Sequence, residues 1–197
     1  MATQFEKMEN FKAHLDKFIK INDEEFASIF SYFQVFEVKK KENLMLEGEV
    51  CKFKYFVLKG CLRKFFVNEK GVEQTTEFAI ENWWIADNFA FENQTKTEFN
   101  IQAVEKATIV AIDFQSQELL LEKHPIMEKY FRMVYQRAYA AAEKRIRYLY
   151  EMSKEEYYIH FNTLYPWFTQ RIPQYLLASF LGFTPEYLSE IRAKLRS

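Results

Sequence analysis

The residues best suited to chemistry in this chain are hydrogen-bonding and basic side chains near its carboxyl end. Two segments with helical patterning, QYLLASFL and PEYLSEIRAKL, flank a single glycine, Gly182. Leu177 and Leu181 lie four residues apart on the first segment, and Leu188 and Ile191 lie three apart on the second. Each segment therefore has an apolar face for the other. Gly182 can take the left-handed conformation that ends a helix. The spacing predicts two short helices joined by a tight turn.

The second segment is typical of a helix that presents side chains to the major groove of DNA. Thr184 can cap it, and Pro185 suits its first turn. A carboxylate such as that of Glu186 can accept a hydrogen bond from a cytosine amino group. The positions expected to face the bases are Thr184, Pro185, Glu186, Ser189, Glu190 and Ala193. Phosphate contacts are expected from Arg171, Arg192, Lys194 and Arg196. An ordinary helical corner with no role in DNA binding is the alternative.

The charge of the chain is small in total but unevenly distributed. The net charge is −1, which excludes a general binder of polyanions. Residues 1–136 carry a net charge of −4, from 18 Lys or Arg and 22 Asp or Glu. Residues 137–197 carry +3, from 9 basic and 6 acidic residues. This division suits a two-part protein whose carboxyl-terminal part contacts something anionic.

Other kinds of chemistry find little support in the sequence. Residues 33–113 contain no histidine, whereas a metal-dependent enzyme built on a β-barrel needs several. No Ser-His-Asp, P-loop or dinucleotide motif occurs, so we expect no catalytic residues, no metal and no cofactor. Cys51 and Cys61 are expected to be small buried side chains in a reducing cytoplasm. The amino terminus is not a secretory signal, and no apolar run is long enough to span a membrane.

The middle of the chain has the texture of an antiparallel β structure. From about residue 33 to 113, short β-branched and aromatic runs alternate with turns. Gly48, Gly60 and Gly71 lie 12 and 11 residues apart, and each suits a turn with positive φ. The pattern predicts a sandwich or barrel.

A long helix is predicted over about 125–150, since this stretch contains no glycine after Pro125. Apolar side chains recur along it at spacings of three and four, and the small residues of AYAAA would let two backbones approach closely. Self-association along this seam predicts a homodimer. The alternative is a helix packed on its own β domain. The predicted seam consists of Met127, Phe131, Val134, Ala138, Ala141 and Tyr148.

Taken together, GE…YFVLKGCLR, the long helix and FNTLYPWFTQRIPQYLLASFLGFTPEYLSEIRAKL resemble the Crp/Fnr-type transcriptional regulators, in particular the branch with a shortened carboxyl-terminal domain. The resemblance implies an α+β fold. Residues 1–150 would form an antiparallel β-roll of the cyclic-nucleotide-binding, jelly-roll type, with the dimerisation helix at its end. Residues 151–197 would form a small all-α helix-turn-helix domain without a clear wing, because the chain ends at Ser197. The implied partners are double-stranded DNA and a second copy, with RNA polymerase a further candidate.

The sequence departs from the family at the effector position. Nucleotide-binding members hold the ribose with a Gly-Glu pair and the cyclic phosphate with an arginine about ten residues later. The corresponding pairs here are Ala86–Asp87 and Thr97–Glu98, so the arginine is missing and Lys96 is the only nearby cation. Tyr130 and Phe131 occupy the purine-contacting positions and are bulky. We therefore expect an effector other than cAMP or cGMP. The candidate pocket residues are Ala86, Asp87, Lys96, Thr97, Glu98, Tyr130 and Phe131.

The recognition segment departs from the family as well. Glu190 stands where the family commonly has arginine, and it brings a second negative charge toward DNA. Two functions stay open at this point. The chain is a dimeric regulator that reads DNA, or it is a degenerate relative that binds a small ligand or a protein without sequence-specific DNA binding.

Overall fold

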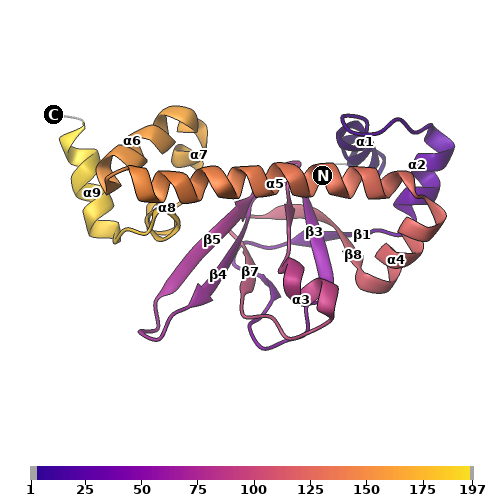
Figure 1. Cartoon of the computed structure of the whole chain (residues 1–197), viewed down its shortest axis with the longest axis horizontal. Helices are drawn as coiled ribbons and strands as arrows, with labels where there is room; N and C mark the ends of the chain where they lie inside the picture. The colour runs from indigo at the N-terminus through magenta and orange to yellow at the C-terminus, as the bar shows by residue number, and fades with distance from the viewer. Residues whose placement is uncertain (1–3, 196–197) are drawn as a thin grey trace. The chain divides into compact units, whose positions relative to one another are not determined.

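Two four-stranded antiparallel sheets form the centre of the fold (Figure 1). The computed structural model describes the backbone of residues 4–195 and side chains from residue 7. The first sheet has the strand order β1, β8, β3, β6, which are Gln34–Val38, Ala107–Asp113, Phe53–Lys59 and Trp84–Ile85. The second has the order β2, β7, β4, β5, which are Asn43–Met45, Asn100–Ala103, Leu62–Val67 and Glu73–Ala79. The predicted jelly-roll-like β-roll is therefore confirmed.

The interior of the roll is apolar because alternate residues of each strand point inward. Val57, Leu62, Ile85, Ile101 and Ile109 are all buried in one cluster, together with Phe91 of the short helix α3 (Asn88–Asn93). The three glycines expected in turns all have positive φ: Gly48, Gly60 and Gly71. Gly60 lies in the turn between β3 and β4 and packs against the start of β8. A Cβ at Gly60 would lie 2.7 Å from the Cα of Ala107, so only glycine fits there.

A second apolar cluster lies between the first sheet and the helices that flank it. It contains Phe11 of α1 (Gln4–Leu15), Ile29 of α2 (Asp23–Phe30), Phe56 of β3 and Leu120 of α4 (Phe114–Lys123). Asn22 caps α2 in a capping box with Glu25. The first turns of α5 (Ile126–Glu151) enter the same cluster through Met127, Tyr130 and Phe131.

The remaining helices are α6 (Lys154–Leu164), α7 (Pro166–Arg171), α8 (Gln174–Leu181) and α9 (Pro185–Lys194). Two compact units divide the chain, and each is described below by itself. The first comprises Met1–Phe66 and Glu77–Gln136, and the second comprises Val67–Thr76 and Arg137–Ser197. The division into compact units falls within α5, after Gln136, and places part of the β4–β5 hairpin in the second unit. The domain boundary at residue 150 stays a prediction.

No helix among residues 4–195 has both the length and the apolar character required to cross a lipid bilayer.

Candidate functional site

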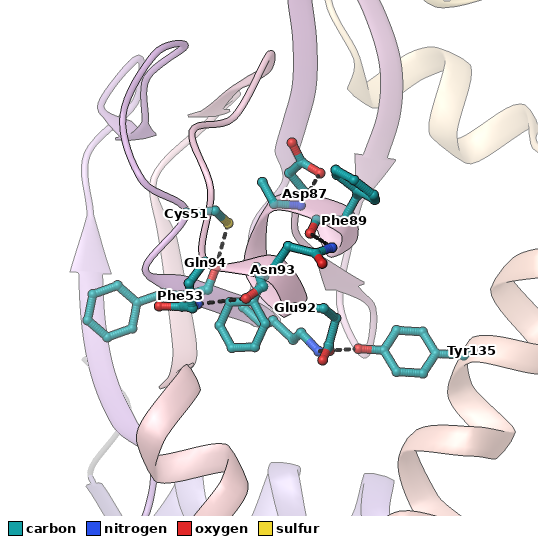
Figure 2. Close-up of polar contacts among 11 residues, drawn as sticks. Cys51, Phe53, Asp87, Phe89, Glu92, Asn93, Gln94 and Tyr135 are labelled. Carbon is teal, nitrogen blue, oxygen red and sulfur yellow. Dashed lines mark hydrogen bonds and ion pairs between the residues drawn. The ribbon is translucent and has the colours of Figure 1, made fainter.

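The predicted effector position of the roll contains a hydrogen bond between Asp87 and Thr97. Asp87 begins α3, and its Oδ1 accepts the backbone N–H of Ala90 at 3.1 Å. Thr97 Oγ1 donates to Asp87 Oδ2 at 2.7 Å. Both residues are buried, with 8% and 2% of their surfaces exposed. The structure thus joins one member of each predicted pocket pair, and Figure 2 shows Asp87 at the start of α3.

The other predicted residues of this loop lie at the surface, except Ala86. Ala86 is buried, whereas Lys96 and Glu98 are exposed. Lys96 lies in an isolated backbone bridge with Val50. The sequence predicts Lys96 as the only cation near the pocket, but a less exposed lysine of the sheet also contacts this loop.

That cation is Lys64 of β4. Its ammonium donates to the carbonyl oxygen of Ala86 at 2.9 Å and forms an ion pair with Glu77 of β5 at 2.7 Å. It also lies 5.4 Å from the centroid of the Phe99 ring. The alternation of side chains along β4 could have indicated this position of Lys64. Lys64 lies two residues after Leu62, so both side chains are on the same face of the strand, and Leu62 is inside the roll.

A second buried ammonium links α3 to α5. Lys54 of β3 is only 2% exposed and lies 2.5 Å from Oε1 of Glu92. It also forms a 2.6 Å hydrogen bond with the Tyr135 hydroxyl of α5 and lies 4.4 Å from the Phe91 ring centroid. Figure 2 shows Glu92 and Tyr135 converging on this ammonium. Because both partners are distant in sequence, sequence reasoning gave no indication of this contact.

Tyr130 and Phe131 lie in the cluster outside the roll, not in the cluster that contains Phe91. The Tyr130 hydroxyl accepts a 2.8 Å hydrogen bond from Trp84 Nε1, and its ring meets those of His14 and Phe18 edge-on. Burial raises the pKa of the Tyr130 phenol. These two predicted pocket residues are thus separated from the Asp87–Thr97 pair by their packing.

Both cysteines are buried free thiols, as predicted. Burial raises the pKa of Cys51, which keeps this thiol protonated at neutral pH. No group of three or more metal-ligating side chains occurs within the described part of the chain.

The helix pair at the carboxyl end has the predicted local structure. Gly182 ends α8 with φ 78°. Thr184 Oγ1 accepts the backbone N–H of Tyr187 at 3.2 Å, and Pro185 opens α9. The facing leucines and isoleucine are buried, namely Leu177, Leu181, Leu188 and Ile191.

The predicted base-facing residues form one exposed face of α9 and its cap. All of Thr184, Pro185, Glu186, Ser189, Glu190 and Ala193 are exposed. Ser189 donates to the Pro185 carbonyl of its own helix at 2.9 Å, which leaves its oxygen able to accept. Of the predicted phosphate contacts, Arg171 and Arg192 are half-buried and Lys194 is exposed. Arg196 lies outside the described residues.

The predicted seam of α5 divides into a covered and an open part. Met127 and Phe131 are buried within this chain, and Val134 is half-buried against the same cluster. Farther along, Ala138 and Ala141 are exposed. Tyr148 is half-buried and contacts the rings of Tyr157 and His160. Four larger exposed side chains accompany the open part: Tyr139, Ile146, Leu149 and Tyr150.

Comparisons with known proteins agree with this architecture. Residues 35–124 match the family model described as the cyclic nucleotide-binding domain. FixK2 from Bradyrhizobium japonicum has a TM-score of 0.68 at 16% identity, covering 83% of this chain and 84% of its own. A Crp/Fnr-family protein from Eubacterium rectale has a TM-score of 0.67 at 14% identity, with coverages of 89% and 84%. The catabolite activator protein of Thermus thermophilus has a TM-score of 0.56 at 19% identity, with coverages of 89% and 84%.

No protein of curated function matches the sequence. The Eubacterium rectale protein is described as a transcriptional regulator. Residues 35–124 are therefore similar to the cyclic nucleotide-binding domain family, and the chain as a whole shares the fold of the Crp/Fnr-family transcriptional regulators.

Proposed function

We propose that this protein is a dimeric, cytoplasmic DNA-binding transcriptional regulator whose β-roll responds to an effector other than cAMP or cGMP. The observation that carries the proposal is the capped helix α9, whose exposed face includes the hydrogen-bonding side chains of Glu186, Ser189 and Glu190. A helix with this exposure, held by a buried partner helix, is the element that helix-turn-helix proteins insert into the major groove.

The composition of this face favours weak binding that depends strongly on salt. Glu186 can accept a hydrogen bond from a cytosine amino group. Glu186 and Glu190 both repel the phosphates, so the affinity depends on Arg171, Arg192 and Lys194. Because each recognition helix brings only a few cations to the phosphates, the affinity of the dimer depends on the contacts that both helices make together.

Dimerisation is supported by the open part of α5. Ile146, Leu149 and Tyr150 expose 55%, 51% and 88% of their surfaces. Exposed apolar side chains along a helix with the small residues Ala138 and Ala141 suit the close approach of a second copy. A parallel pair of such helices would place two recognition helices on successive major grooves, about 34 Å apart.

The closed effector position argues against a cyclic mononucleotide. Thr97 stands at the phosphate-binding position, and its hydroxyl already donates to Asp87. Lys64, the half-buried cation that contacts the Ala86 carbonyl, forms an ion pair with Glu77. A cyclic phosphate would therefore find no guanidinium fork and would have to break existing hydrogen bonds.

Selection of duplexes from a random library, with the full-length protein, tests the DNA-binding part of the proposal. We expect an enriched sequence with two related half-sites, and affinity that falls steeply as salt is raised. Sedimentation equilibrium tests the dimer. Ala141→Glu should produce monomers, whereas Glu143→Gln, a change at an exposed site of the same helix, should not.

The second candidate is a module that binds a ligand or protein without reading DNA. It is favoured by Glu190, which adds a second exposed negative charge to the face that would meet phosphates. Failure to enrich any sequence, from a protein that sediments as a folded dimer, would select this candidate.

A further inference from the structure

The tip of the β4–β5 hairpin belongs to the same compact unit as the helices α6 to α9. This segment, Val67–Thr76, turns tightly around Asn68 and Gly71. Asn68 Oδ1 accepts the N–H groups of Lys70 and Val72, each at 3.0 Å. The backbone N–H of Asn68 donates to the carbonyl of Val72 at 3.0 Å. The tip is therefore held in one conformation by its own hydrogen bonds.

Ser179 of α8 occupies the open edge of β5. The strand order places β5 at the edge of its sheet, so one side of its backbone has no neighbouring strand. The Ser179 hydroxyl accepts the N–H of Thr75 at 2.8 Å and donates to the carbonyl of Glu73 at 2.8 Å. Residues two apart on a strand direct these groups to the same edge. Gln74 completes the contact by donating from its side chain to the Ser179 carbonyl.

Arg145 of α5 joins the same hairpin to the end of α8. Its guanidinium donates to the carbonyl of Thr76 and, at 2.7 Å, to the carbonyl of Phe180. It also stacks on the Phe180 ring, 4.0 Å from the centroid. The Phe180 carbonyl is in the last turn of α8, beyond which the helix does not continue. A single guanidinium thus ties three elements together at fixed positions.

We propose that the β4–β5 hairpin tip acts as the support of the helix-turn-helix, with Ser179 and Arg145 as its positioning residues. The hairpin tip braces α8 through the hydrogen bonds of Ser179 and Arg145. The hairpin tip is continuous in sequence with the parts of β4 and β5 that belong to the roll. The effect on DNA reading rests on the proposed function, whereas the support itself does not.

Amide hydrogen exchange, measured residue by residue on the full-length protein, tests the support without DNA. In Ser179→Ala the Thr75 amide loses its acceptor, and we expect its exchange to become about tenfold faster, or more. Ser179→Thr keeps a hydroxyl and should restore slow exchange. Ser31→Ala removes a hydroxyl that bonds only within its own helix end, and it should leave Thr75 unchanged.

A matched pair of arginines tests the second contact. Arg145→Lys keeps the charge but cannot reach both carbonyls with a planar fork, so the amides of α8 and β5 should exchange faster. Arg147→Lys changes an exposed arginine that pairs with Glu151, and it should change neither. Unchanged exchange at Thr75 in Ser179→Ala, with the fold retained, would overturn the inference.

DNA binding by the same variants separates this inference from the proposed function. We expect Ser179→Ala to lose about tenfold in affinity for the selected duplex while keeping its sequence preference. Full affinity in a variant whose Thr75 amide exchanges rapidly would show that the hairpin does not position α9. If the unaltered protein binds no duplex, the proposed function fails, and the exchange data alone decide whether the hairpin is the support.

Discussion

The predicted effector position of the roll and the exposed face of α9 differ in whether their polar atoms have hydrogen-bond partners within the chain. Asp87 and Thr97 are buried, and both oxygens of the carboxylate accept hydrogen bonds within the chain. Glu186 and Glu190 are exposed, and neither forms an ion pair with any described residue. The polar atoms of the first site therefore belong to the folded structure, whereas those of the second are exposed to solvent.

This difference predicts opposite consequences for mutations. A buried hydrogen-bonded group contributes to folding, because its removal leaves a partner unsatisfied. An exposed group without a partner contributes little to folding, and its removal changes only what the surface binds. Stability measurements should therefore respond at Thr97, and binding measurements at α9.

The largest effect is expected for Thr97→Val. The variant has nearly the same volume but leaves Asp87 Oδ2 buried without its 2.7 Å donor. The free energy of unfolding should fall by about 2–3 kcal/mol, since hydrogen bonds to charged groups are among the stronger ones. Urea denaturation measures this change. Thr97→Ser keeps the hydroxyl and is the control. Equal midpoints for Val and native protein would contradict the assignment of this site to structure.

Glu186→Gln and Glu190→Gln form a matched pair on the exposed face of α9. Both remove one negative charge, and both should leave the free energy of unfolding within about 0.5 kcal/mol of the native value. If Glu186 accepts from cytosine, its substitution should cost about 1–3 kcal/mol of discrimination at one base pair. Glu190→Gln should instead tighten binding to all sequences, because it removes a repulsion from phosphates. Fluorescence anisotropy with the selected duplex and its single-base variants distinguishes these outcomes.

Arg192→Gln should have a smaller effect that appears mainly in the salt dependence. Arg192 is on α9 and half-buried, and it has been proposed above as a phosphate contact. Loss of one such contact should reduce the slope of log affinity against log salt by about 0.9 per recognition helix. Arg132→Gln, an exposed arginine at the other end of the long helix α5, is the control. An unchanged slope in Arg192→Gln would remove this residue from the phosphate contacts.

The features that the sequence predicted correctly are local ones. Gly182 ends α8 and Thr184 caps α9 because these conformations depend on neighbours within four residues. The positive φ angles of Gly48, Gly60 and Gly71 likewise follow from turn chemistry. The resemblance of motifs then supplied the β-roll, which no local rule could have assembled.

The features that it missed depend on pairs far apart in the chain. Lys54 and Tyr135 are 81 residues apart, and Arg145 and Thr76 are 69 apart. Nothing in the spacing of either residue indicates its partner. The predicted seam of α5 shows a related difficulty, because periodicity reveals an apolar face but not what covers it. Here Met127 and Phe131 are covered by the chain's own amino-terminal helices and first sheet.

The smallest effect is expected at Glu156, which differs from Glu186 and Glu190 because its carboxylate has a hydrogen-bond partner within the chain. Glu156 accepts the backbone N–H of Ser153 at 2.8 Å in the capping box of α6. Hydrogen bonds with Ser153 lower the pKa of this carboxylate, and the side chain of Ser153 contributes more than its backbone amide. Because the pKa of Glu156 is lower in the folded than in the unfolded protein, its ionised carboxylate stabilises the fold at pH values above the unfolded-state pKa of about 4.3. This stabilisation is lost as the pH falls through the pKa of the folded state.

Exchange of the Ser153 amide should therefore become faster in the native protein as the pH is lowered through this range, after correction for intrinsic rates. In Glu156→Gln the amide oxygen can still accept this hydrogen bond but does not titrate, so the pH dependence should disappear while most protection is kept. The same profile in both proteins would mean that Glu156 does not secure the start of α6. In that case its carboxylate would be as free of intrachain partners as those of Glu186 and Glu190, and α6 would have to be held at its first turn by packing alone.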